Sequence, residues 1–243
     1  VERELKGKTF LGRVYIVAAG KAAWQMAHAA RACLQDNFCG GVVVTKYGHV
    51  NGEIADVACF EGGHPVPDEN SLRGTDAALA LTEDLTESDT VVFLLSGGGS
   101  ALFEKPLLPF AELQDVTNQL LGAGADIVEI NTIRKRLSAV KGGRFARHCA
   151  PAQVFAVVLS DILGDPLDMI ASGPAYPDSS SCAQALDIAK RYGLRLSERA
   201  WALLAQETPK TVEIVEPQMT GSVRELGAAA AAANITAGYS LPW

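Results

Sequence analysis

Short apolar runs that alternate with helical patterns constrain the fold of this chain more than any other feature. The runs are rich in β-branched residues and lie near residues 13–18, 41–45, 56–60, 90–95 and 153–159. Apolar runs of this length are typical of strands that are buried on both faces. Their alternation with helices predicts a doubly wound, mostly parallel sheet with helices on both faces, which is a three-layer, Rossmann-like α/β fold.

Helical patterns follow most of these runs. The chain contains no internal repeat and no low-complexity linker, so we expect a single α/β domain over residues 1–243. Residues 211–215 are a further candidate strand, although Glu213 weakens the pattern. Helices are expected over residues 21–35, 69–85, 110–122, 125–140, 182–192, 197–206 and 222–237.

The composition limits the classes of partner. A chain of 243 residues with 48% hydrophobic and 20% charged residues is an ordinary globular protein with a sizeable core. Its net charge of −7 argues against non-specific binding to nucleic acid. Its 5 cysteines form no Cys-x-x-Cys pair, and no signal peptide or membrane-spanning run is evident. We therefore expect a cytoplasmic protein that binds small molecules rather than nucleic acid or a membrane.

A glycine-rich turn follows the run at 90–95. The residues Ser96, Gly97, Gly98, Gly99 and Ser100 leave backbone N–H groups uncovered, and a following helix would direct its positive end to the same place. This pattern predicts an anion site, although a tight turn without a ligand explains the glycines equally well. A dinucleotide fingerprint and a P-loop are excluded, because the further glycine and the Gly-Lys-Ser/Thr sequence that they require are missing.

Two more turns that follow predicted strands carry residues that could bind or react with a ligand. After the first run come Gly20 and Lys21, and a lysine at the start of a helix is electrostatically misplaced unless it meets an anion. A solvated lysine is the alternative. Another loop holds His64 next to Pro65, with Asp68 placed to cap the next helix. Taken alone, His64 is better explained as a hydrogen-bonded structural histidine than as a catalyst.

A basic segment covers residues 131–148, which contain six Lys or Arg residues and no acidic residue. Asn131 begins this segment. On one continuous helix, Arg134, Ser138 and Lys141 share a face that can receive a phosphate or a carboxylate. A solvated basic helix is the alternative interpretation.

Three aspartates follow the run at 153–159. Asp161 lies nearest the end of the strand and can hold Mg²⁺ or accept the proton of an attacking hydroxyl. Asp165 and Asp168 serve equally well as metal ligands or as turn and capping residues. Glycine turns, a lysine, a basic segment and aspartates at strand ends together suggest phosphoryl transfer from a nucleotide to a small anionic substrate.

These segments resemble the N-terminal part of the glycerate 2-kinases of the MOFRL type, which phosphorylate D-glycerate with ATP and Mg²⁺. The resemblance runs in the same order and spacing from about residue 13 to about residue 238. It rests on Ala19-Gly20-Lys21-Ala22, Glu61 to Glu69, Ser96 to Leu102, Asn131 to Lys135 with Leu137-Ser138 and Lys141-Gly142-Gly143, and Leu159-Ser160-Asp161 through Gly164-Asp165-Pro166 to Ala171-Ser172-Gly173-Pro174.

The resemblance implies specific roles for these residues. Lys21 would be the essential lysine and the turn from Ser96 to Ser100 would line the cleft, whereas Gly221-Ser222-Val223 departs from the family pattern. We expect Lys21 and Asp161 to be catalytic and Asp161 and Asp165 to bind the metal. The expected binding residues are Gly20, His64, Ser96, Gly97, Gly98, Gly99, Ser100, Asn131, Arg134 and Lys141.

The resemblance also implies a second, C-terminal α/β domain that this chain lacks, with the active site between the two domains. We therefore expect the chain to fold by itself without turning over ATP and glycerate, and a homodimer is left open. Two other interpretations remain at this point. One is a non-catalytic module that binds an anion or a nucleotide, and the other is an isomerase-like enzyme for sugar phosphates or carboxylates.

Overall fold

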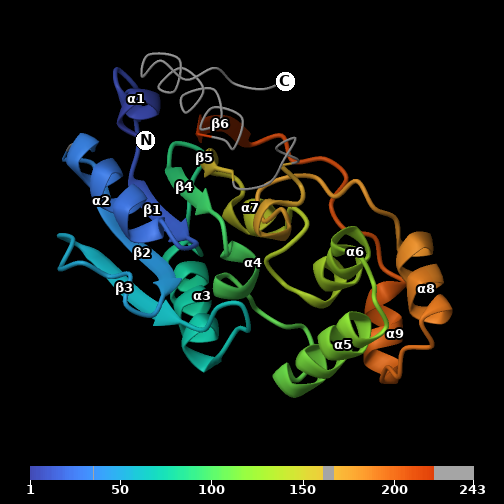
Figure 1. Cartoon of the computed structure of the whole chain (residues 1–243). Coiled ribbons are helices and arrows are strands. Elements are labelled where there is room, and N and C mark those ends of the chain that lie inside the picture. The colour runs from blue at the N-terminus through green and yellow to red at the C-terminus, as the bar shows by residue number, and fades with distance from the viewer. Residues whose placement is uncertain (35, 161–166, 222–243) are drawn as a thin grey trace, which may run out of the picture.

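A computed structural model of the chain describes residues 1–34, 36–160 and 167–221. Within these ranges, six parallel strands form one sheet in the order β3-β2-β1-β4-β5-β6 (Figure 1). The direction of strand addition reverses between β1 and β4, so the predicted doubly wound fold is confirmed. The strands are β1 (Val14–Ala19), β2 (Phe38–Lys46), β3 (Val57–Gly62), β4 (Thr90–Ser96), β5 (Gln153–Leu159) and β6 (Val215–Gly221).

Helices follow most of the strands, as the sequence predicts. Asp68 caps α3 by accepting a hydrogen bond from the amide of Ser71 (3.0 Å). The helix expected over 222–237 lies outside the described residues. The helices are α1 (Glu2–Leu5), α2 (Ala23–Cys33), α3 (Glu69–Leu81), α4 (Gly99–Leu102), α5 (Phe110–Gly122), α6 (Ile127–Leu137), α7 (Arg144–Cys149), α8 (Cys182–Arg191) and α9 (Glu198–Leu204), with a short 3₁₀ turn at Ile170–Ser172.

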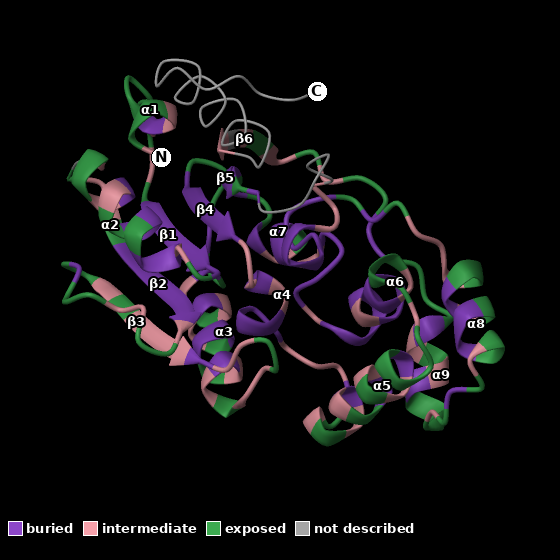
Figure 2. Cartoon of the chain, in the orientation of Figure 1, coloured by how far each residue is buried: buried purple, intermediate pink, exposed green. Residues whose placement is uncertain are grey.

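The central strands are buried on both faces (Figure 2). In β1, Val17 and Ala19 pack with the residues of α3 and α7, whereas Ile16 and Ala18 pack with those of α2. Each fully buried aliphatic side chain contributes about 1.5–3 kcal/mol to folding. This packing explains why the strands read as continuous apolar runs in the sequence, and it holds their carboxyl ends rigidly at one edge of the sheet.

Four helices form a lobe beside the sheet instead of covering it (Figure 1). α5, α6, α8 and α9 enclose a separate core that includes Leu113, Ile133 and Leu204. A buried carboxylate, Asp178, joins α6 to the segment that follows the 3₁₀ turn by accepting a hydrogen bond from Lys135 (3.0 Å). Burial raises the pKa of Asp178, but hydrogen bonds and the charge of Lys135 outweigh burial and hold it at about 2.

Three predicted elements differ from the structure. The helix expected over 69–85 ends at Leu81, where the amide of Thr82 donates to the carbonyl of Leu79 instead of continuing the helix. The helix expected over 125–140 ends at Leu137, because the carbonyl of Leu137 accepts from the amide of Leu107 (2.9 Å) and the backbone at Ser138 is extended. The strand expected over 211–215 begins only at Val215. It is an edge strand with polar residues and a proline, Pro217, so it carries no apolar run that marks it in the sequence.

Candidate functional site

The reversal of strand order places two turns side by side at the carboxyl ends of β1 and β4. The amide of Lys21 donates to the carbonyl of Gly97 (2.8 Å), and the amide of Ala22 donates to the Oγ of Ser96 (3.0 Å). In open α/β sheets, ligands bind in the crevice at this reversal. The fold therefore brings together the lysine and the glycine turn that the sequence singled out separately.

Gly20 and Ser96 hold the two turns in close contact. Gly20 has a φ of +123°, and a Cβ at this position would lie 2.3 Å from the Oγ of Ser96. Only glycine allows this approach. Because Ser96 is buried and its hydroxyl oxygen accepts from the backbone, its position supports the turn rather than direct contact with a ligand.

Lys21 and His64 converge on Gly98. Gly98 has a φ of +89°, and a Cβ there would lie 2.9 Å from Cδ2 of His64 and 3.1 Å from Cγ of Lys21. Any side chain at Gly98 would therefore displace both residues. The structure thus joins three predicted site residues from three different loops into one cluster, with the Lys21 side chain exposed.

Backbone amides form the base of this cluster. The N–H groups of Gly98, Gly99 and Ser100 donate no hydrogen bond to another described residue, so they are available to an anion. A helix does follow the turn, as expected, but α4 has only four residues and therefore adds little through its dipole. The positive electrostatic potential of this site therefore comes from the backbone amides of the turn and from Lys21.

A segment with left-handed backbone packs against the glycine turn at Gly99. Ala171, Ser172 and Gly173 all have positive φ values of 52°, 62° and 64°, and a Cβ at Gly99 would lie 2.6 Å from the Cβ of Ala171. Left-handed backbone at non-glycine residues is costly and concentrates at functional sites. The contact with Gly99 explains why the turn tolerates no larger residue at that position.

A chain of hydroxyl groups links this segment to the glycine turn. The buried Ser172 hydroxyl donates to Oδ1 of Asn131 (2.8 Å), and the hydroxyls of Ser172 and Ser100 are 3.0 Å apart. Because Ser172 has only one proton to donate, Ser100 is the donor in the second bond. The oxygen of Ser100 is therefore left as an acceptor, which suits the hydroxyl of a substrate better than an anion.

A buried carboxylate occupies the space that the basic segment was expected to offer to a ligand. Glu104 is fully buried, and its Oε2 lies 3.2 Å from Nη2 of Arg134 and 3.5 Å from Nζ of Lys141. Both cations also donate to the carbonyl of Ser100 at 2.9 Å. The predicted single helical face of Arg134, Ser138 and Lys141 is wrong, since α6 ends before Ser138. Whether Arg134 and Lys141 also contact a ligand remains a prediction.

The cluster of Glu104, Arg134 and Lys141 has two positive groups and one negative group. It contacts the glycine turn through the carbonyl of Ser100. Burial lowers the pKa of Lys141 to about 8, against the opposing effect of the Glu104 carboxylate. The second carboxylate oxygen of Glu104, Oε1, is buried without a hydrogen-bond partner. Glu104 was not among the predicted site residues, although a lone acidic residue after the apolar pair Leu102-Phe103 is a visible signal in the sequence.

The predicted metal ligands Asp161 and Asp165 lie outside the described residues. The carboxylate of Asp168 accepts from Lys135 (3.2 Å) and from Ser179 (2.6 Å), which accounts for it without a metal. Among residues 1–34, 36–160 and 167–221, no group of three His, Cys, Asp or Glu side chains could hold a metal ion. The magnesium site therefore stays a prediction.

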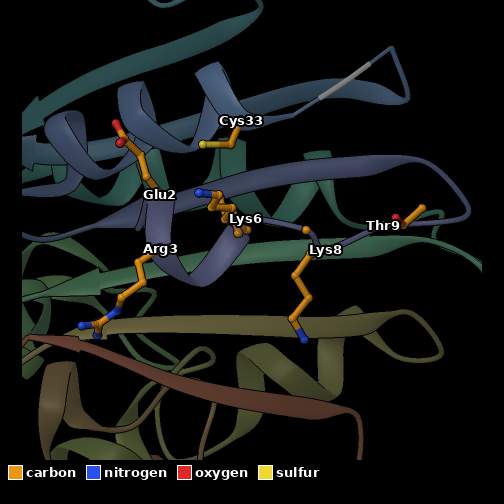
Figure 3. Close-up of a pocket in the computed structure, with 8 residues that line it drawn as sticks. Glu2, Arg3, Lys6, Lys8, Thr9 and Cys33 are labelled. Carbon is orange, nitrogen blue, oxygen red and sulfur yellow. The ribbon is translucent and has the colours of Figure 1, made fainter.

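A second hollow, of about 700 Å³, lies around α1 (Figure 3). It is formed by α1, by the segment from Lys6 to Thr9 and by Cys33 at the end of α2. None of the predicted site residues lines it. It does not compete with the strand-end cluster as the functional site.

Comparison with known proteins identifies the family. The family model described as "Domain of unknown function (DUF4147)" matches residues 2–205. The chain belongs to the DUF4147 family. Within the described residues of this DUF4147 chain, no helix is long and apolar enough to cross a membrane.

Named relatives of this DUF4147 chain include kinases. A D-glycerate 2-kinase of Thermotoga maritima is 53% identical over 226 residues, which are 92% of this chain and 54% of the relative. The crystal structure of glycerate kinase from Thermotoga maritima matches with a TM-score of 0.91 at 50% identity, over 98% of this chain and 59% of that chain. The expected resemblance to this group of enzymes is confirmed.

Two of these relatives carry a different name. A protein of Agrobacterium vitis, provisionally named as a hydroxypyruvate reductase, is 41% identical over 237 residues, which are 93% of this chain and 53% of the relative. The DUF4147 chain thus spans about half the length of the curated relatives that it matches.

Proposed function

We propose that this chain is the α/β domain of a D-glycerate 2-kinase that binds nucleotide and substrate, and that the whole enzyme converts ATP and D-glycerate to 2-phosphoglycerate. The convergence of Lys21 and His64 on Gly98, at the reversal of strand order, carries this proposal. The kinase named in the Thermotoga relative supports it. Because the chain spans about half of such relatives, the complete reaction is proposed for the whole protein.

The cluster is suited to phosphoryl transfer. Enzymes catalyse this reaction mainly by positioning the reactants and stabilising the charge that develops on the transferred group. The ammonium group of Lys21 and the amides of Gly98, Gly99 and Ser100 are the groups that do so in our proposal. The net positive charge of the cluster beneath the turn adds to the attraction for an anion.

The alcohol of the substrate needs an acceptor for its proton. Ser100 offers a hydroxyl oxygen whose own proton is directed to Ser172, so it can accept a hydrogen bond from the hydroxyl of D-glycerate. We propose Asp161 as the general base or metal ligand, and Asp165 as a second metal ligand. Mg²⁺ would neutralise charge on the phosphates of ATP. The cytoplasmic location and a homodimer remain predictions.

A reductase is the second candidate, because the strand order is that of dinucleotide-binding sheets and two relatives carry such a name. A dinucleotide fingerprint that starts at Gly20 would need glycines where Ala22 and Gln25 stand. These residues favour the kinase. The names of the relatives favour neither a non-catalytic module nor an isomerase.

Product analysis tests the proposal. The full-length protein is incubated with ATP, Mg²⁺ and D-glycerate, and the products are resolved by ³¹P NMR. We expect ADP and 2-phosphoglycerate. Formation of 3-phosphoglycerate alone, or reduction of hydroxypyruvate by NADH or NADPH without any phosphoryl transfer, would contradict the proposal. The 243-residue chain is measured in parallel and is expected to fold without turnover.

A further inference from the structure

An apolar groove of about 450 Å³ lies between the loop after β3 and the helices α5 and α6. Three large apolar side chains from these three elements line it and remain unusually exposed, namely Val66 (60%), Leu121 (59%) and Ile127 (65%). A volume in this range is typical of pockets for small molecules. Pro65 and Pro67 restrict the loop on one side, so the groove is formed in advance of binding.

One wall of the groove is polar. Gln114 and Asn118 lie one turn apart on α5 and both line the groove. Neither side chain makes a hydrogen bond with another described residue, and each amide offers both a donor and an acceptor. A nucleobase has two apolar faces and an edge with donors and acceptors. The groove therefore combines the two kinds of surface that recognise a nucleobase.

The groove is joined directly to the anion cluster. Pro65 lines the groove and follows His64, the ring of which lies against Gly98. Arg134, at the other side of the groove, donates to the carbonyl of Ser100 (2.9 Å). A single ligand with an apolar end in the groove can therefore reach the free amides of the glycine turn with its anionic end.

We propose that this groove holds the nucleoside of the phosphate donor, with its phosphates on the turn from Gly98 to Ser100. The inference rests on the proposed kinase function and adds the location of the nucleotide. The side-chain amides of Gln114 and Asn118 and the guanidinium group of Arg134, all in the wall of the groove, favour a nucleotide over an apolar segment of a partner protein. A second copy of the chain on the groove is the competing occupant.

Affinities for ADP and for inorganic pyrophosphate, measured by calorimetry on the 243-residue chain, test this location. Thr117 lies in the groove, and Thr117→Trp fills it from the side of α5. We expect its Kd for ADP to rise at least about tenfold, while the Kd for pyrophosphate stays within about twofold. Ala111→Trp is the matched control, because Ala111 is exposed on the same helix outside the groove.

A smaller change, Asn118→Ala, tests the same groove in case Thr117→Trp does not fold. Asn118 is exposed, so Asn118→Ala leaves the packing of α5 intact and is expected to weaken ADP alone by about fivefold. Unchanged ADP affinity in both groove variants would overturn the location but leave the kinase proposal standing. If the wild-type chain binds ADP no more tightly than pyrophosphate, the inference is also wrong. Loss of a dimer in Thr117→Trp, with ADP affinity unchanged, would assign the groove to a second copy.

Discussion

Replacing Gly98 by alanine tests whether Lys21 and His64 form one binding unit around the turn. The φ of +89° at Gly98 costs an L-residue about 1–2 kcal/mol. A new Cβ would also lie 2.9 Å from Cδ2 of His64, 3.0 Å from its Nε2 and 3.1 Å from Cγ of Lys21. All three are side-chain atoms, so the turn can persist only if both side chains move.

The two effects are separable by a control. Gly7 has a φ of +78° and nothing within 4 Å of its Cβ position, so Gly7→Ala carries the backbone cost without the contacts. Each kcal/mol lowers the Tm of a chain of this size by about 2–4 °C, so both variants are expected to melt roughly 2–8 °C lower. Only Gly98→Ala should also weaken pyrophosphate binding, by at least about tenfold.

Calorimetric titration with pyrophosphate, together with thermal melting of both variants, is the assay. If Gly98→Ala binds pyrophosphate as tightly as Gly7→Ala does, the anion does not sit on the turn. The convergence of Lys21 and His64 would then be a structural contact only. A loss of binding in both variants would point to general destabilisation instead.

Three further predictions concern the residues beneath the turn. Burial lowers the pKa of Lys141 from 10.5 to about 8, so the unfolded chain binds more protons between these pH values. The stability of the wild-type chain relative to Lys141→Met should therefore rise by up to about 3 kcal/mol from pH 8 to 10.5 in urea denaturation. Glu104→Gln should destabilise the chain by about 3–5 kcal/mol in the same assay, because it leaves two buried cations unpaired; a change below about 1 kcal/mol would contradict this. Asn131→Asp keeps the acceptor for Ser172, so kcat of the full-length protein should fall less than in Asn131→Leu, and equal losses would contradict the direction of that hydrogen bond.

The sheet was largely predictable because its central strands are buried on both faces. Burial of this kind requires continuous apolar residues, and these are visible in the sequence. The edge strand β6 was placed too early, because an edge strand needs no such run and Pro217 breaks the pattern. The end of α6 at Leu137 depends on Leu107, which is distant in the sequence, and no local signal marks it.

The candidate site was predictable in its parts but not in its assembly. Gly20 and the glycines after β4 stand in turns that directly follow apolar runs, so the sequence alone marks them. A parallel sheet then brings the carboxyl ends of its strands, and these turns with them, to the same side. Lys141 was predicted to share an anion-binding helical face with Arg134 and Ser138, whereas it lies beyond the end of α6 and is buried against Glu104. The pairing of Glu104 with Lys141 depends on how the segment after α4 packs on the segment after α6. Nothing in the sequence around either residue indicates this contact.

The kinetic effect of Lys21→Met tests the central claim most directly. The side chain of Lys21 is exposed, so the substitution should leave the Tm of the full-length protein unchanged. The formation of 2-phosphoglycerate from ATP and D-glycerate is followed in a coupled assay. Removal of one group that stabilises charge in a transfer site lowers kcat by about 10²–10³, which is the result we expect. A variant with wild-type kcat and wild-type Tm would show that the lysine at the reversal of strand order takes no part in the reaction.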